Sequence, residues 1–322
     1  MTPSLSGDNG TGAGGSYIPG AFYGTEGADL ILTRDAPGIF VGNGGNDTYL
    51  VNGSTDTVIE AAGGGTDIVY STASFTLGSA EVEAISTVQQ TDTTAINLIG
   101  NYVSQTIVGN YGNNILNGGG GQDRLIGLFG DDTYAIGDSR TVIQEQAGEG
   151  NDTLVTSVDY RLSTGVSIEV IAAQDASSTT GLRLTGNELA QTIAGTAGAD
   201  TIGGGGGRDV LIGGAGADTF VIGTVATGNV AVLADYAAGT DRIGLTSTAF
   251  NVGTGLDAAE FVAGTAAATA DQRVIYDAGT GQLFYDADGN GAGAAILFAQ
   301  VVPGTAITAA SFDVIVPTAT AG

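Results

Sequence analysis

The chain contains no cysteine and no histidine, and its 8 basic residues are all arginine. Without cysteine there is no disulfide framework or thiolate metal site, and without histidine no imidazole ligand. Most nucleophile and general-base arrangements draw on His, Cys or Lys, so they are unavailable as well. We therefore expect a protein that is not an enzyme.

Positive charge and long apolar runs are also scarce. Thirty-four acidic residues face 8 basic ones, a formal net charge of −26. Phosphate binding needs a basic patch, so nucleic acid is excluded as a partner, and polyvalent cations are the natural counterpart. No run approaches the roughly 18 apolar residues of a membrane span. The start, MTPSLSGDNG, has neither the basic nor the apolar part of a cleavable secretory signal. By these absences alone the protein would be cytosolic.

Glycine, by contrast, is abundant: there are 56 glycines and only 5 prolines, in a chain that is 42% hydrophobic. This composition allows a sizeable core and many tight turns, and the lack of a three-residue period excludes collagen. Glycine loses more backbone entropy on folding than any other residue, so its repeated use needs a compensating gain.

The chain is built from internal repeats at two scales. GDDTYAIG (130–137) matches GADTFVIG (216–223), and GGTDIVYSTASFTL (64–77) matches EGNDTLVTSVDYRL (149–162), so a unit of about 85 residues is duplicated. Within it runs a period of nine residues. Ten nonamers are recognised, at 24–32, 42–50, 100–135 and 186–221.

Two columns of the nonamers are constrained. The eighth position is apolar in all ten: Ile31, Tyr49, Ile107, Leu116, Leu125, Tyr134, Ile193, Ile202, Leu211 and Phe220. The sixth is aspartate in seven: Asp29, Asp47, Asp123, Asp132, Asp200, Asp209 and Asp218. We interpret each nonamer as a six-residue glycine-rich turn followed by a three-residue strand. Eighteen residues then form one coil of an all-β parallel solenoid with two stacked sheets.

The turns predict metal sites. Glycines allow sharp turns that aim carbonyl oxygens between stacked turns, and one aspartate per turn adds charge. An all-oxygen ligand set suits calcium, so we expect several calcium ions. The candidate ligands are the seven aspartates, Asn114 with its neutral oxygen, and the turn glycines Gly118, Gly120, Gly204, Gly206 and Gly213.

Some turns depart from the pattern. Gln105 and Gln191 replace the aspartate, and their nonamers also lack the fourth-position glycine, so we expect coils without a full metal turn. Asn114 predicts a weaker site with Asp132 than Asp200 forms with Asp218. Asp67 and Asp152 follow glycine runs outside the nonamers, and whether they bind metal is left open.

The pattern G-G-x-G-x-D-x-U-x resembles the repeat-in-toxin family, the hemolysin-type calcium-binding repeats. The resemblance covers residues 24–225 and implies a calcium-loaded parallel β-roll. We interpret 51–99 and 136–185 as irregular coils of the same solenoid, so that it comprises two units of about 85 residues and a partial N-terminal unit. Separate small domains are the alternative.

Residues 226–322 lack the nonamer, and 272–301 predict strands joined by glycine-rich turns. This region resembles the C-terminal part of proteins exported by type I secretion, which implies an uncleaved export signal and an extracellular or cell-surface location. It would form a β-rich cap. DADGNG (286–291) imitates an EF-hand loop, but Leu297 stands where the bidentate glutamate is required, so we expect a structural turn in preference to a calcium loop.

Residues 1–23 predict a flexible arm in which Tyr17, Ile18, Phe22 and Tyr23 cap the first coil or dock on a neighbouring molecule. The sequence favours a secreted calcium-binding structural protein that assembles at the cell surface or in the matrix, as a surface-layer, biofilm or adhesin component. One alternative is a non-catalytic folding and secretion module like those attached to secreted enzymes. Another is a small enzyme whose site escapes motif analysis.

Overall fold

The computed structural model describes residues 4–5, 21–32 and 37–316, and the chain divides into two compact units, Met1–Val155 and Thr156–Gly322. Within the described residues the only helical element is one 3₁₀ turn, η1 (Ala309–Ser311). No helix in this part of the chain is long and apolar enough to cross a membrane. The predicted all-β class is confirmed.

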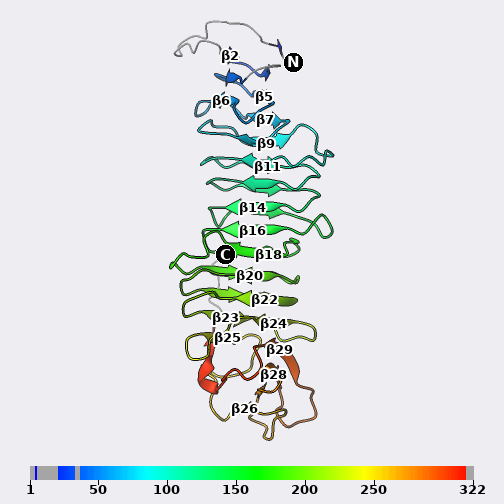
Figure 1. Cartoon of the computed structure of the whole chain (residues 1–322), viewed down its shortest axis with the longest axis vertical. Helices are drawn as coiled ribbons and strands as arrows, with labels where there is room; N and C mark the ends of the chain where they lie inside the picture. The colour runs from blue at the N-terminus through cyan, green and yellow to red at the C-terminus, as the bar shows by residue number, and fades with distance from the viewer. Residues whose placement is uncertain (1–3, 6–20, 33–36, 317–322) are drawn as a thin grey trace. The chain divides into compact units, whose positions relative to one another are not determined.

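The first unit is a stack of short parallel strands in three sheets (Figure 1). The largest sheet contains β1 (Ser4–Leu5), β3 (Asp29–Leu32), β5 (Thr48–Val51), β7 (Ile68–Ser71), β9 (Ala84–Thr87), β11 (Thr106–Val108), β13 (Arg124–Ile126) and β15 (Val142–Gln144). A second contains β8 (Phe75–Thr76), β10 (Leu98–Ile99), β12 (Ile115–Asn117) and β14 (Thr133–Ile136). The third contains β2 (Ala21–Tyr23), β4 (Ile39–Val41) and β6 (Thr57–Ile59). Strand β16 (Thr153–Thr156) includes the division between the units.

The second unit repeats this arrangement and adds a hairpin region. One sheet contains β17 (Tyr160–Arg161), β19 (Arg183–Thr185), β21 (Thr201–Gly203), β23 (Thr219–Ile222), β25 (Arg242–Thr246) and β30 (Phe312–Ile315). The other contains β18 (Val170–Ala173), β20 (Thr192–Ala194), β22 (Arg208–Ile212), β24 (Val230–Leu233), β26 (Phe261–Ala263), β27 (Val274–Asp277), β28 (Gln282–Tyr285) and β29 (Ile296–Gln300).

The register confirms the coil of two nonamers. Ile107 pairs with Leu125 across β11 and β13, and Leu116 pairs with Tyr134 across β12 and β14. Each pair is eighteen residues apart, so consecutive strands alternate between two sheets and every second strand stacks. The turns of repeats n and n+2 therefore lie on the same side.

The eighth-position side chains form the core. All ten have an exposed fraction of 0%. Burial of one such side chain is worth about 1.5–3 kcal/mol, but no three-residue strand buries its own. The stability of each strand therefore comes from its neighbours in the stack.

Parallel pairing extends beyond the nonamers at both ends. β2 pairs with β4, and the ring of Phe22 stacks on that of Phe40 with centroids 6.0 Å apart. Of the other expected capping residues, Tyr23 lies in β2, and Tyr17 and Ile18 lie outside the described residues. Past residue 225, β24 pairs with β22 and β25 with β23, all in parallel. β27, β28 and β29 are the strands expected from 272–301, and they pair antiparallel.

Candidate metal centres

The sixth-position aspartates stand at the junction of turn and strand, with their side chains buried. None of the seven is more than 3% exposed. In the six from Asp47 to Asp218, one carboxylate oxygen accepts the backbone N–H of the residue that occupies the same place one coil earlier. Asp29 N–H donates to Asp47 Oδ1 (2.9 Å), and Asp200 N–H donates to Asp218 Oδ1 (2.8 Å). The carboxylates thus form a ladder from coil to coil.

The first-position glycines make room for the second carboxylate oxygen. A Cβ added to Gly118, Gly204 or Gly213 would overlap Oδ2 of the aspartate in the same turn. Gly120 and Gly206, at the third position, do not have left-handed backbone; the positive φ angles occur on either side of them, at Gly119, Gly121, Gly205 and Gly207. The turn therefore needs glycine for two separate reasons, a close approach and a backbone conformation that side chains disfavour.

Three carboxylates converge at two places in the first unit. One cluster is Asp47, Glu60 and Asp67, and the other is Asp132, Glu145 and Asp152. In each cluster all three residues are buried, and one oxygen from each lies within 4.8 Å of the others. Of the described residues, only these two sets bring three possible ligands so close.

The strands place the members of each cluster in the same way. Asp47 immediately precedes β5, Glu60 follows β6, and Asp67 immediately precedes β7. Asp132, Glu145 and Asp152 stand in the same relation to β14, β15 and β16. In each cluster the two aspartates come from stacked turns. The glutamate comes directly after the strand that lies between those turns in the sequence.

Burial dominates the electrostatics of the clusters. It raises the pKa of Asp47 to about 6 and the pKa of Glu60 to about 7. It also raises the pKa of Asp132 to about 7 and that of Glu145 to about 9. The charged neighbours that contribute to these shifts are all carboxylates, which raise the pKa values further.

Several cluster oxygens are buried and unpaired. Asp47 Oδ2, Asp67 Oδ2, Asp132 Oδ2 and Glu145 Oε1 have no hydrogen-bond partner among the described residues. Leaving a carboxylate oxygen buried without a partner is costly, and a cation removes that cost. Hard oxygen donors without nitrogen or sulfur are the ligands that calcium prefers. The clusters therefore fit calcium.

Sequence reasoning found four of these six residues. It named Asp47 and Asp132 and left Asp67 and Asp152 open; the structure places both open residues in the clusters. It missed Glu60 and Glu145. A signal was present, because the two glutamates are separated by 85 residues, like the aspartates of the two clusters.

The Gln105 and Gln191 turns carry amides in place of metal ligands. Gln191 Nε2 donates to Asn187 Oδ1 (2.7 Å), and Asn187 Nδ2 donates to the carbonyl oxygens of Ser163 and Val166 (2.8 Å each). Gln105 and Asn101 repeat these bonds. The asparagine N–H groups thus satisfy carbonyls of the preceding coil, and the absence of metal from these turns stays a prediction. We call each Asn–Gln pair an amide clasp.

Asn114 makes bonds like those of the clasps, with Asn110 as its partner, and its role as a metal ligand stays a prediction. Its Oδ1 accepts the Asn110 N–H (2.8 Å), and its Nδ2 donates to Asn110 Oδ1 (2.8 Å). Asn110 Nδ2 in turn donates to the Thr94 carbonyl (2.8 Å). Both ends of the Asn114 amide are therefore used within the turn.

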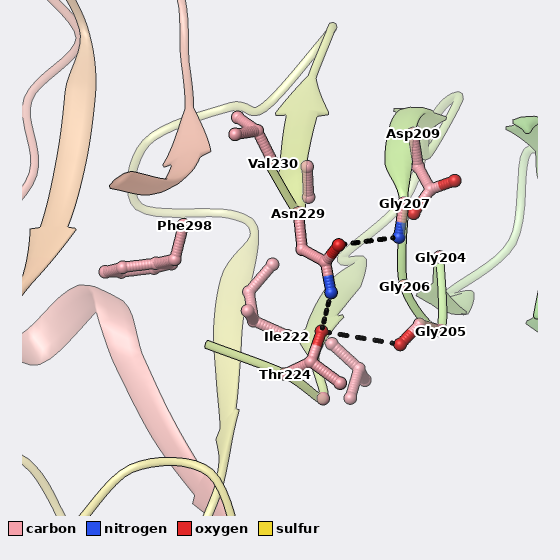
Figure 2. A pocket seen from close by; sticks show the side chains of 13 residues that line it. Gly204, Gly205, Gly206, Gly207, Asp209, Ile222, Thr224, Asn229, Val230 and Phe298 are labelled. Carbon is pink, nitrogen blue, oxygen red and sulfur yellow. Dashed lines mark hydrogen bonds between the residues drawn. The ribbon is translucent and has the colours of Figure 1, made fainter. Parts of the chain in front are cut away.

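The turn of Asp209 faces a neutral partner (Figure 2). Asn229 Oδ1 accepts the Gly207 N–H (3.2 Å), and Asn229 Nδ2 donates to Thr224 Oγ1 (3.3 Å). The hollow beside Gly204–Gly207 has a volume of about 20 Å³, which admits one water-sized occupant. This turn lacks the second carboxylate of the clusters.

The ladder of carboxylates that contains Asp200 and Asp218 extends to Asp241, a residue that the sequence analysis did not identify. Asp218 N–H donates to Asp241 Oδ1 (3.0 Å), which extends the ladder past the last nonamer. Burial raises the pKa of Asp218 to about 6, and Asp241 and Asp200 raise it further. No regular spacing connects Asp241 with the nonamers, so only the folded chain reveals it.

The DADGNG segment forms a closed turn. Asp288 N–H donates to Asp286 Oδ1 (3.3 Å), and Asp288 Oδ2 accepts the Gly293 N–H (3.0 Å). Leu297 lies in β29. These bonds support the structural turn expected from the sequence.

Together, the fold and the turns define a parallel β-solenoid whose stacked turns carry buried carboxylates. Residues 99–134 and 185–220 match the RTX calcium-binding nonapeptide repeat in four copies. These two stretches are thus RTX repeats, and RTX repeats bind calcium. The nonamers at 24–32 and 42–50 lie outside the matched residues. No curated protein matches the chain.

Proposed function

We propose that this protein is a secreted, non-catalytic structural component that folds on binding calcium and assembles at the cell surface or in the extracellular matrix. The two buried three-carboxylate clusters carry the proposal. Their unpaired oxygens make the metal-free fold costly, and calcium relieves that cost. RTX repeats are typical of secreted proteins, which supports an extracellular destination.

The calcium concentration is low inside the cell and high outside it, so the calcium sites would fill only after export. Extracellular calcium modules have dissociation constants of roughly 10⁻⁴ to 10⁻³ M, far above the calcium level inside cells. The chain then stays loose during export and folds outside. Type I export through residues 226–322 suits this order of events.

Assembly is tested with the purified full-length chain. Light scattering and electron microscopy in calcium and in chelator measure its state. Calcium-driven polymers or lattices support a structural component of a surface layer, biofilm or adhesin. A stable monomer in saturating calcium contradicts assembly and favours the folding and secretion module.

Export is tested separately in cells that express a type I exporter. A passenger protein fused to residues 226–322 is expected in the medium, and the chain cut after residue 225 is expected to remain inside. Secretion of the truncated chain contradicts the proposed role of the C-terminal region.

A further inference from the structure

Two nonamers differ from the others at the eighth position. Tyr49 and Tyr134 occupy it, whereas the other eight nonamers have Ile, Leu or Phe. Both tyrosines are fully buried, with an exposed fraction of 0%. A buried phenol needs a hydrogen-bond partner, so tyrosine is a costly choice for a position that serves only as core.

Each tyrosine has the same partner. The Tyr49 hydroxyl donates to Glu60 Oε2, and the Tyr134 hydroxyl donates to Glu145 Oε2. The glutamate stands eleven residues after the tyrosine in both copies. None of the other eight nonamers has a glutamate at that spacing from its eighth position. Tyrosine and glutamate thus occur together or not at all.

The hydroxyl bond fixes the glutamate against the two aspartates. It engages Oε2, while Glu145 Oε1 is buried without a partner in the described part of the chain. Asp132 Oδ2 is unpaired in the same cluster, and in the other cluster Asp47 Oδ2 and Asp67 Oδ2 are unpaired. In each cluster one oxygen from each of the three carboxylates lies within 4.8 Å of the others, so carboxylates from stacked turns converge.

We propose that Tyr49 and Tyr134 are positioning residues of two enclosed calcium sites that differ in kind from the sites in ordinary nonamer turns. This inference rests on the proposed calcium-dependent function. In each site the tyrosine holds a third carboxylate beside the aspartate pair. Calcium affinity rises with the number and charge of the ligands and with the rigidity of the site. The two sites therefore bind calcium more tightly than the other turns.

Isothermal titration of the metal-free full-length chain with calcium tests the inference. The double variant Tyr49→Phe/Tyr134→Phe removes two hydroxyls and keeps both rings. We expect two ions per chain to bind about tenfold more weakly, since a hydrogen bond to a charged group is lost, while the remaining ions bind as before. Tyr102→Phe/Tyr111→Phe is the matched control, because these tyrosines are 64% and 37% exposed.

Terbium provides a second readout of proximity. The chain has no tryptophan, so ultraviolet-excited terbium emission reports nearby tyrosine among the 11 present. We expect the sensitised emission of the two tightest ions to disappear in Tyr49→Phe/Tyr134→Phe and to persist in the control. If the double variant does not fold in calcium, each single variant keeps one intact cluster and is expected to weaken one ion.

The outcomes separate this inference from the proposed function. Unchanged affinity and unchanged sensitised emission in the tyrosine variants overturn the positioning role, even where calcium still folds the chain. Failure of the parent chain to bind calcium overturns the proposed function itself. Glu60→Gln/Glu145→Gln must reproduce the loss at two ions, and full affinity in that variant also contradicts the inference.

Discussion

At the scale of single residues, the sixth position of the nonamer decides how a turn is held. An amide there satisfies its own turn: Gln191 accepts the Asn187 N–H (3.2 Å) and donates to Asn187 Oδ1 (2.7 Å). An aspartate such as Asp132 donates nothing and keeps a buried unpaired oxygen within the described structure. The Gln191 turn is therefore complete without metal, and the Asp132 turn is not.

Gln191→Glu tests the amide clasp. The change removes the donor and places a carboxylate oxygen against Asn187 Oδ1, so we expect a loss of about 1–3 kcal/mol in the free energy of unfolding. Urea unfolding in saturating calcium measures it. Gln122→Glu makes the same charge change at an exposed turn position and is the control. Equal midpoints for the two variants would show that the clasp contributes nothing.

The cluster carboxyls predict a pH dependence for the metal-free protein. Their folded pKa values of about 6 to 9 lie above the ordinary values of 3.8 and 4.5. A raised pKa means that the folded state binds more protons, so this stability is complete below about pH 4 and is lost as the pH rises through 6 to 9.

The corresponding measurement follows β content by circular dichroism in metal-stripped buffers. We expect the metal-free chain to retain more β signal at pH 5 than at pH 8, and calcium to remove most of that difference. Greater metal-free β signal at pH 8 contradicts the prediction.

At the scale of elements, strands of three to five residues exist only because they stack. On β12, Leu116 is 0% exposed while its neighbour Ile115 is 44% exposed. Leu116 pairs with Leu98 on one side and Tyr134 on the other. The inward side chain therefore joins three successive coils.

Leu116→Ala tests this stacking. Because the side chain is enclosed, its truncation is expected to cost about 2–5 kcal/mol. Ile115→Ala on the same strand is expected to cost much less, because its side chain is half-exposed. Thermal or urea unfolding in calcium compares the two variants. Similar losses in the free energy of unfolding would show that the buried eighth-position side chains are not the source of stability.

At the scale of the whole molecule, calcium is expected to set the stability. A site contributes about 1.4 kcal/mol when calcium is ten times its dissociation constant, and several sites add up to a large part of a domain's stability of about 5–15 kcal/mol. We expect the melting temperature to rise steadily from micromolar to ten millimolar calcium. Magnesium is the control, since it demands octahedral geometry and gives up water reluctantly. A melting temperature that does not change over this range of calcium concentration contradicts calcium-dependent folding.

The sequence by itself determined the features that repeat locally. The nine-residue period predicted the strands, the inward eighth position and the pairing of every second repeat, because each depends on residues within one or two coils. The sixth-position aspartates and the oxygen-only composition predicted calcium in the same way. Where the repeat is degenerate, the sequence pattern does not locate individual strands. Residues 51–99 and 136–185 were therefore expected only as irregular coils of the solenoid.

Tertiary structure decided what converges between coils. Glu60 and Glu145 become candidate metal-site residues because stacking brings residues seven to twenty positions apart onto one point, and burial there leaves Asp47 Oδ2 and Asp132 Oδ2 without a partner among the described residues. Asn114 turns inward to Asn110 because an amide has both a donor and an acceptor, which its position in the column does not reveal. Asp241 joins the ladder only through the fold of the second unit, because a side chain's environment depends on the coil beside it and not on its period.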